Sequence, residues 1–191
     1  MRIISGSLRS RTLQAPPGLA TRPTSDRLRE TLFNVLAPRI EGAVFLDLYA
    51  GSGAVGIEAI SRGAARVAFV ERAPAALKIL EANLARLGLS AGFRVYPGSA
   101  ASFLRKAQAV SGAGAGFDLV FLDPPYDAAQ EYAATLGLLG GAGAGLLAAG
   151  ALVIAEHRRK ERLEDCYGLL ERTRLLEQGD ASLSFYAAGP L

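Results

Sequence analysis

The chain has 191 residues, half of them hydrophobic, and a formal net charge of +3. This length and composition suit one globular domain with a sizeable core. A single cysteine, Cys166, and a single histidine, His157, exclude an internal disulfide and a metal centre built from these residue types. We find neither a signal peptide nor an apolar run long enough to span a bilayer, so we expect a cytoplasmic protein that uses no metal.

The N-terminal segment is basic. Residues 1–39 contain seven arginines and two acids, which gives this segment a charge of +5 and leaves −2 on the rest of the chain. A preference for arginine over lysine throughout the chain explains the residue type but not the clustering, which predicts a polyanionic partner. Residues 2–15 are typical of two short strands around a turn near Ser7. We expect residues 1–21 to form a hairpin arm that nucleic acid orders, because a lone hairpin is marginally stable. Its predicted nucleic-acid contacts are Arg2, Arg9 and Arg11, with Arg22 just beyond it.

Beyond the arm, strands and helices alternate. The pattern predicts a helix from a cap at Thr24 or Ser25 to Leu36, where Pro38 stops it. Strands are expected at 44–48, 66–71, 93–96, 117–122 and 151–156, helices at 54–62, 74–87, 100–110 and 128–139, and a helix end plus loop at 137–150. Two last strands, 167–177 and 183–188, flank a turn without a helix between them. Residues 22–191 are therefore predicted to form one α/β domain, a Rossmann-like, seven-stranded and mostly parallel sheet with an antiparallel last strand.

A glycine-rich turn follows the first strand of this domain. Gly51, Gly53 and Gly56 form G-x-G-x-x-G between a strand and a helix, and Ser52 lies within the turn. Glu71 ends the next strand, where a carboxylate can accept hydrogen bonds from both hydroxyls of a ribose. Taken alone, this pattern indicates an adenosine-containing ligand and does not separate a dinucleotide from any other.

Three features favour S-adenosylmethionine over NAD. Asp47, four residues before Gly51, would repel a pyrophosphate but suits a cationic amino group. No basic residue follows the turn to pair with a phosphate. Ser99 and Ala100 follow the third strand, where they are placed to meet the edge of an adenine.

The fourth strand ends in Asp123, Pro124, Pro125 and Tyr126, at the same predicted crevice as the glycine turn. The two prolines make this corner rigid. Asp123 and the Pro124 carbonyl can each accept one N–H bond from the exocyclic amine of a base, which aims the nitrogen lone pair at a methyl group and stabilises the developing positive charge. Tyr126 can stack on a base taken out of its helix. We interpret Asp123, Pro124 and Tyr126 as catalytic.

The tetrapeptide DPPY resembles the catalytic motif of amino-methyltransferases that act on adenine N6, guanine N2 or glutamine side chains. Nearly the whole chain is similar to the RsmD family of bacterial 16S rRNA guanine-N2 methyltransferases. The similar stretches are RIISGSLRSRTL (2–13), RPTSDRLRETLFN (22–34), DLYAGSGAVGIEAISRGA (47–64) and SAASFL (99–104).

The resemblance implies a class I S-adenosylmethionine-dependent methyltransferase that modifies guanine 966 of 16S rRNA in the small ribosomal subunit. It also implies that Thr24 and Arg27 close over the tail of the cofactor, and that a set of residues around the glycine turn lines the cofactor site: Asp47, Gly51, Gly53, Glu71, Ser99 and Ala100. We expect a monomer.

Other functions stay open at this point. An enzyme of the same fold could act on adenine N6 in DNA, on another RNA base or on a protein glutamine, although the basic arm disfavours glutamine. A non-catalytic RNA-binding protein would not need an intact Asp123 and glycine turn. An NAD-dependent oxidoreductase would have no use for the Pro-Pro corner.

Overall fold

The computed structural model describes residues 1–15, 25–110, 116–125 and 129–188, without the side chains of residues 107–110 and 129. Its helices are α1 (Asp26–Ile40), α2 (Ala54–Ser61), α3 (Pro74–Arg86), α4 (Ala100–Val110) and α5 (Ala129–Gly140), with a short 3-10 turn at Ala144–Leu146. Its strands are β1 (Val44–Leu48), β2 (Arg66–Glu71), β3 (Phe93–Pro97), β4 (Phe117–Leu122), β5 (Leu147–Arg158), β6 (Cys166–Tyr167), β7 (Leu170–Gln178) and β8 (Ala181–Ala188).

These strands form one sheet in the order β3-β2-β1-β4-β5-β8-β7-β6. The first five are parallel, and β8 runs antiparallel between β5 and β7. The seven predicted strands are all present, and the two-residue β6 adds an eighth. The predicted fold is confirmed, with its last strand, β8, inserted antiparallel to its neighbours β5 and β7.

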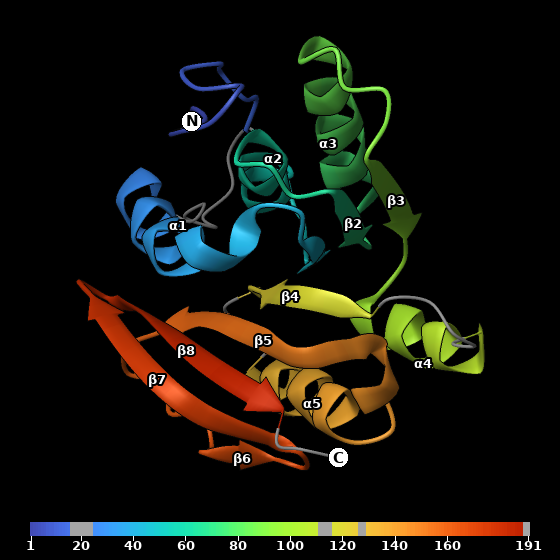
Figure 1. The fold of residues 1–191 in the computed structure, drawn as a ribbon, viewed down its shortest axis with the longest axis vertical. Helices are drawn as coiled ribbons and strands as arrows, with labels where there is room; N and C mark the ends of the chain where they lie inside the picture. Colours follow the sequence, from blue (N-terminus) through green and yellow to red (C-terminus); the bar gives the residue numbers. More distant parts are fainter. Residues whose placement is uncertain (16–24, 111–115, 126–128, 189–191) are drawn as a thin grey trace.

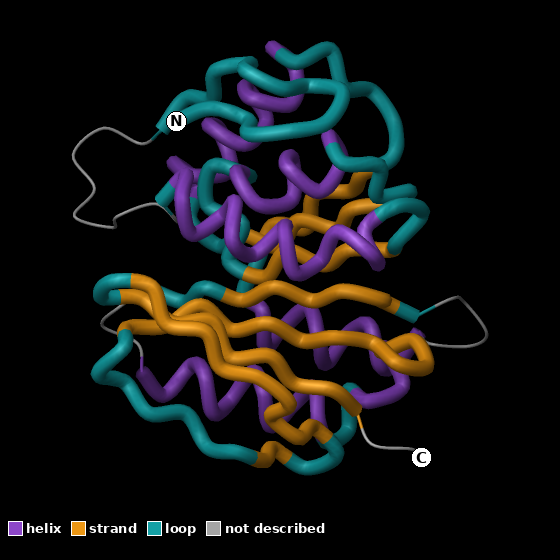
Figure 2. Tube along the Cα trace, turned by 60° about the vertical axis from the view of Figure 1, so that its left-hand side comes forward, coloured by secondary structure: helices purple, strands orange, loops and turns teal. Residues whose placement is uncertain are grey.

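Helices cover both faces of the sheet (Figures 1 and 2). Successive residues of a strand point to opposite faces. Phe45, Phe121 and Ile154 therefore pack with α1, α2 and α3 in one core cluster. Their neighbours Leu46, Leu122 and others pack with α4 and α5 in the second cluster. This alternation determines to which face of the sheet the side chain of each residue at a strand end points.

Two boundaries differ from the prediction by four residues, more than any other. α1 runs to Ile40 with Pro38 inside it, because Pro38 and Asn34 lie on the exposed side, where water can bond the carbonyl that the missing N–H leaves. β5 begins at Leu147, inside the stretch predicted as loop. Leu147 pairs with Phe117 before a register shift, and the small residues that follow it fit this irregularity.

The N-terminal arm is docked on the domain, beside α2 (Figure 1). It contains a single bridge, between Arg2 and Thr12, in place of the two strands expected. Ile3 and Leu13 are 1% and 3% exposed and belong to the core cluster under α1 to α3. The marginal stability expected of a lone hairpin therefore does not apply to residues 1–15. The predicted boundary between arm and domain at residues 21 and 22 lies outside the described residues.

A buried glutamate on α2 anchors the arm. Glu58, which is fully buried, accepts hydrogen bonds from the backbone N–H groups of Ile4 (2.8 Å) and Ser5 (3.0 Å). It also pairs with Arg62 at 2.8 Å and lies 3.7 Å from Arg29, which is itself fully buried. Charge-assisted bonds of this kind are strong, and they fix the arm to both α1 and α2.

Candidate active site

Three predicted site carboxylates come from neighbouring strands. Asp47 lies on β1, Glu71 ends β2 and Asp123 follows β4, and these strands are adjacent in the order β2-β1-β4. The strands are parallel, so their carboxyl ends meet at one edge of the sheet, where ligands bind in open α/β folds. The structure therefore brings together the carboxylates of the predicted cofactor and catalytic regions.

The glycine-rich turn needs its glycines. Gly51 and Gly53 have φ of 56° and 82°, in the left-handed region. A Cβ on Gly53 would come within 2.3 Å of Leu80, whereas one on Gly51 would meet nothing closer than 4.0 Å. Gly51 therefore leaves its side of the turn clear for a ligand, while Gly53 serves the packing of α2. Ser52 is buried within the turn.

Asp47 is bonded to the first turn of α2. Its carboxylate is 2% exposed, and Oδ2 accepts the Gly56 N–H at 2.9 Å. A Cβ on Gly56 would come within 2.2 Å of the Phe69 ring and 3.0 Å of this oxygen, so the third glycine is required for the packing of α2 on β2 and leaves room for the contact. Burial raises the pKa of Asp47 to about 7, with a smaller contribution from Glu71, while the Gly56 bond opposes the shift. A nearby cationic amino group would favour the charged form of this acid.

Glu71 organises the turn before any ligand binds. It is 8% exposed, its Oε2 accepts the Gly51 N–H at 2.8 Å and its Oε1 accepts the Ala73 N–H at 2.7 Å. Each carboxylate oxygen has a second lone pair. The predicted contact with ribose hydroxyls is therefore compatible with the two backbone bonds.

The third strand leads into α4 at the same edge. Ser99 is half-buried, and its Oγ accepts the Ser102 N–H at 3.2 Å, as a residue capping α4 does. Ala100 is 3% exposed and begins this helix. Both lie where the sequence predicted an adenine contact, and a contact with adenine stays a prediction.

The predicted catalytic corner follows β4 directly. Asp123 is half-buried, Pro124 is buried and Pro125 is exposed, while Tyr126 lies outside the described residues. Burial raises the pKa of Asp123 well above its usual range, and the carboxylates of Glu156 and Asp47 raise it further. Such shifts are frequent where a group performs proton chemistry.

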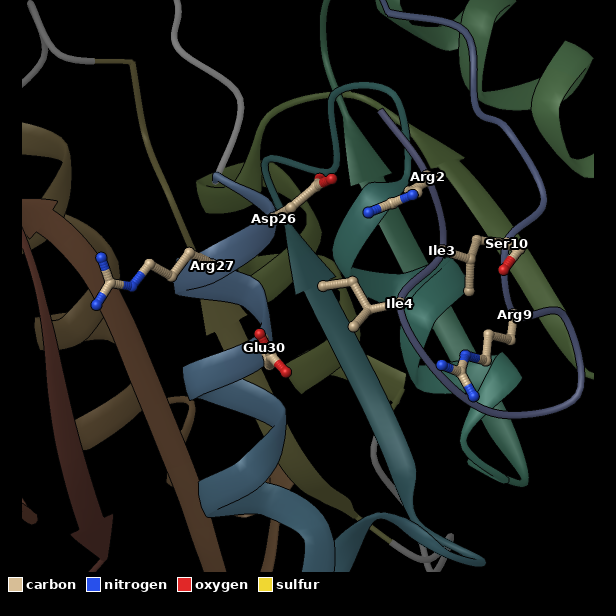
Figure 3. A pocket seen from close by; sticks show the side chains of 8 residues that line it. All are labelled: Arg2, Ile3, Ile4, Arg9, Ser10, Asp26, Arg27 and Glu30. Carbon is tan, nitrogen blue, oxygen red and sulfur yellow. The ribbon is translucent and has the colours of Figure 1, made fainter.

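Two arginines of the arm, Arg2 and Arg9, line a groove of about 340 Å³ beside the start of α1 (Figure 3). Arg2, Arg9 and Arg27 contribute positive charge, and Asp26 and Glu30 oppose it. Arg11 is exposed but does not line this groove. Two predicted residues, Arg22 and Thr24, lie outside the described residues. The structure thus places Arg27 with the arm arginines, at the end of α1 nearest the carboxyl edge of the sheet.

Three residues near the site were missed by the sequence analysis. Glu156 follows the same rule as Asp47, Glu71 and Asp123, because it is an acid near the carboxyl end of a strand, and this signal was overlooked. Tyr49 has a φ of 68° and its hydroxyl bonds Thr135 at 2.7 Å. The buried Asn83 donates to the carbonyls of Ser52 and Gln14, which joins the arm to the turn. No local pattern marked these two residues.

Within the ranges that the structure describes, no three His, Cys, Asp or Glu side chains are grouped so that they could hold a metal ion. No helix in those ranges is long and apolar enough to cross a membrane.

Comparison with known proteins gives a match along the whole chain. The family model described as "Conserved hypothetical protein 95" matches residues 1–187. "Putative rRNA methyltransferase YlbH" of Bacillus subtilis (strain 168) is 38% identical over 97% of this chain and 98% of its own length. "Ribosomal RNA small subunit methyltransferase D" of Escherichia coli (strain K12) is 45% identical over 66% of this chain, and the match spans 60% of that relative.

The solved structures agree. "Putative methyltransferase yhhF from Escherichia coli" has a TM-score of 0.81 at 38% identity and covers 98% of this chain and 97% of its own. At the level of the fold alone, a structure described as "a putative methyltransferase complexed with SAH" matches at 14% identity with a TM-score of 0.68. The methyltransferase fold is confirmed, and the predicted S-adenosylmethionine cofactor agrees with these similarities.

Proposed function

Because the chain belongs to the RsmD family, we propose that it methylates the N2 amine of a guanine, guanine 966, in the 16S rRNA of the small ribosomal subunit. The observation that carries this proposal is the Asp123–Pro124 corner, which follows β4, the strand beside the glycine turn of β1, in a chain that matches the family from residue 1 to 187. We further propose that the protein acts in the cytoplasm as a monomer.

The residues around the turn fit S-adenosylmethionine. Asp47 offers a negative charge for its amino group, Gly51 leaves open space, and Glu71 has lone pairs left for ribose hydroxyls. We propose Ser99 and Ala100 as the adenine contacts, and Ser52, Thr24 and Arg27 as further cofactor contacts. When bound, the cofactor supplies an electrophilic methyl group on a sulfonium.

Asp123 and Pro124 would hold the substrate amine. Its lone pair is delocalised into the base, which makes it a poor nucleophile. Two acceptors at a rigid corner fix the two N–H groups and leave the lone pair directed at the methyl group. They also stabilise the positive charge that forms on the nitrogen. Tyr126 would stack on the flipped base.

The arm would bind the RNA backbone. Arg2, Arg9 and Arg11 are exposed, and Arg2 and Arg9 line the groove shown in Figure 3. Arginine contacts with phosphates position a protein on nucleic acid without reading its sequence. Because the arm is anchored on α2, RNA bound there would lie at a fixed place relative to the domain.

The test maps methylated nucleotides by mass spectrometry in small subunits from a strain that lacks the protein, before and after purified protein and S-adenosylmethionine are added. We expect one N2-methylguanine to appear, at position 966. Free 16S rRNA and duplex DNA serve as competing substrates. Methylation of adenine in the duplex, or of another RNA base, would replace the proposed substrate, and no transfer to any of them would contradict the proposal.

A further inference from the structure

In the register of β4 and β5, Glu156 on β5 is opposite Asp123, which follows β4. Phe121 pairs with Ile154 and Leu122 with Ala155 in the parallel register of β4 and β5, so the next residues along each strand are Asp123 and Glu156. Because side chains alternate, both acids point to the face that holds Phe121 and Ile154, which is also the face of Asp47. Neighbouring strands lie about 4.8 Å apart. Asp123 and Glu156 thus occupy neighbouring positions at the ends of adjacent strands.

Glu156 is placed to act on Asp123 and not on a substrate. It is only 2% exposed, whereas Asp123 is half-buried. Two like charges at this distance in a partly buried site resist simultaneous ionisation. Burial raises the pKa of Asp123 most, and the negative charges of Glu156 and then of Asp47 raise it further. Asp47 lies level with Phe121, two residues before Asp123, and its carboxylate is bonded to α2.

Other charged groups reach the same edge of the sheet. β2 brings Glu71, and Arg72 after it pairs with Glu131 of α5 at 2.9 Å. The N-terminal turn of α1 brings Asp26, Arg27 and Glu30, and β1 is followed by the phenol of Tyr49. Among these described groups, none is a cause of the Asp123 shift, which leaves Glu156 as the leading charged neighbour.

We propose that Glu156 is a positioning residue for methyl transfer: its carboxylate, held beside Asp123, makes Asp123 a stronger base for the proton that the newly methylated amine loses. This inference rests on the proposed function. The nitrogen lone pair forms the N–C bond while the C–S bond breaks and its electrons stay on sulfur. The nitrogen then carries one proton too many, which Asp123 takes. The neutral carboxyl group returns this proton to water after the product leaves.

Raising the basicity of Asp123 would favour this proton transfer. A general base works best when its pKa lies near the working pH, and the ordinary pKa of an aspartate lies about three units below neutral pH. Removing the charge at position 156 should therefore make Asp123 ionise more easily and act as a weaker base.

The first experiment measures the single-turnover rate of methyl transfer to small subunits against pH. The rate falls on the acid side as Asp123 becomes protonated. In Glu156→Gln we expect this acid limb to move down by about one to two pH units, and the plateau rate to fall by about tenfold. Glu156→Asp keeps the charge, so its acid limb should stay near that of the wild type. Glu171→Gln changes an exposed acid on β7, two strands away from β5, and should leave the profile unchanged.

The second experiment needs no RNA. In protein carrying ¹³C-labelled aspartate, the Asp123 carboxyl signal is assigned by its loss in Asp123→Asn and followed through a pH titration. We expect a midpoint well above 4 that moves down in Glu156→Gln. An ordinary midpoint in the wild type, or an acid limb that does not move in a folded Glu156→Gln protein, would overturn the inference. Wild-type protein that fails to methylate subunits would refute the proposed function alone, because the titration would still report on the pair.

Discussion

The unusual proton affinity of Asp47 predicts a pH-dependent affinity for S-adenosylmethionine. With a pKa near 7, this buried acid is about half ionised at neutral pH and about one-tenth ionised at pH 6. If the charged form binds the amino group of the cofactor, the dissociation constant of the wild type should rise about tenfold for each pH unit below 7. Binding at pH 6 should also release close to one proton.

Asp47→Asn tests this directly. The amide oxygen can still accept the Gly56 N–H, so the start of α2 keeps its bond. The variant loses the charged contact, which is worth roughly 1.5–3 kcal/mol, or about a 10- to 100-fold weaker affinity at pH 7.5. Its affinity should be flat from pH 5.5 to 7.5, because nothing at position 47 titrates.

Titration calorimetry in two buffers of different ionisation enthalpy gives both the affinity and the proton release. Asp118→Asn is the matched control, since Asp118 also accepts a backbone N–H, from Val44 at 2.8 Å, at the other end of the sheet. This control should bind like the wild type. An affinity for the wild type that does not change between pH 5.5 and 7.5 would refute the reasoning.

The same shift has a consequence for stability. A carboxyl group whose pKa is raised on folding stabilises the protein below its unfolded pKa of about 4, and this contribution is lost as the pH rises through about 7. Asp47→Asn should therefore gain stability relative to the wild type between pH 4 and 8 in thermal unfolding. A constant difference between the two proteins would show that Asp47 titrates normally.

Three further predictions concern the other proposed roles. Asp123→Ala should lower the single-turnover rate about 10²- to 10³-fold while calorimetry shows little change in cofactor affinity, and near-normal turnover would remove Asp123 from catalysis. Glu71→Ala should raise the dissociation constant of S-adenosylmethionine about 10- to 100-fold, and unchanged affinity would exclude Glu71 from the cofactor site. The triple change of Arg2, Arg9 and Arg11 to serine should reduce the slope of log affinity for RNA against log salt by about 2–3 and leave cofactor binding intact. A slope equal to that of an Arg86→Ser control would contradict a role for the arm.

The sequence predicted the sheet because its signals are local and repeated. Each strand–helix unit carried its own periodicity, and each of the acids that we selected lay at or near the carboxyl end of a strand. Parallel topology then put these strand ends at one edge without further information. The same rule, applied to the acid of β5, would have found Glu156.

The misses have a different origin. The register of neighbouring strands decides which acids point to the same face of the sheet and which lie opposite one another. The sequence of either strand alone does not determine the register across a β–α–β connection. The pairing of Leu122 with Ala155 is what places Glu156 beside Asp123. Asn83 is beyond prediction for the same reason, since its three hydrogen bonds join Gln14 and Ser52, segments that are 69 and 31 residues away.

Counting the arginines of the N-terminal segment overestimates the positive charge that is available to bind RNA, because the count ignores contacts within the protein. The arginines of the arm and those of α1 were counted as one cluster, yet Arg29 is fully buried, pairs with Asp26 at 3.0 Å and lies beside Glu58. That charge is neutralised inside the protein and cannot attract RNA. Only the exposed arginines remain available for this purpose.

The docking of the arm also decides which experiment is informative. Deleting residues 1–21 would remove Ile3 and Leu13 from the core and expose the residues that they cover. It would also remove the two backbone N–H groups that donate hydrogen bonds to Glu58. Removing partners from a buried charge destabilises a protein by several kcal/mol. A truncated protein would therefore lose activity through unfolding, whether or not the arm binds RNA. Substituting only the exposed arginines keeps these contacts, so a change in salt dependence can be assigned to charge.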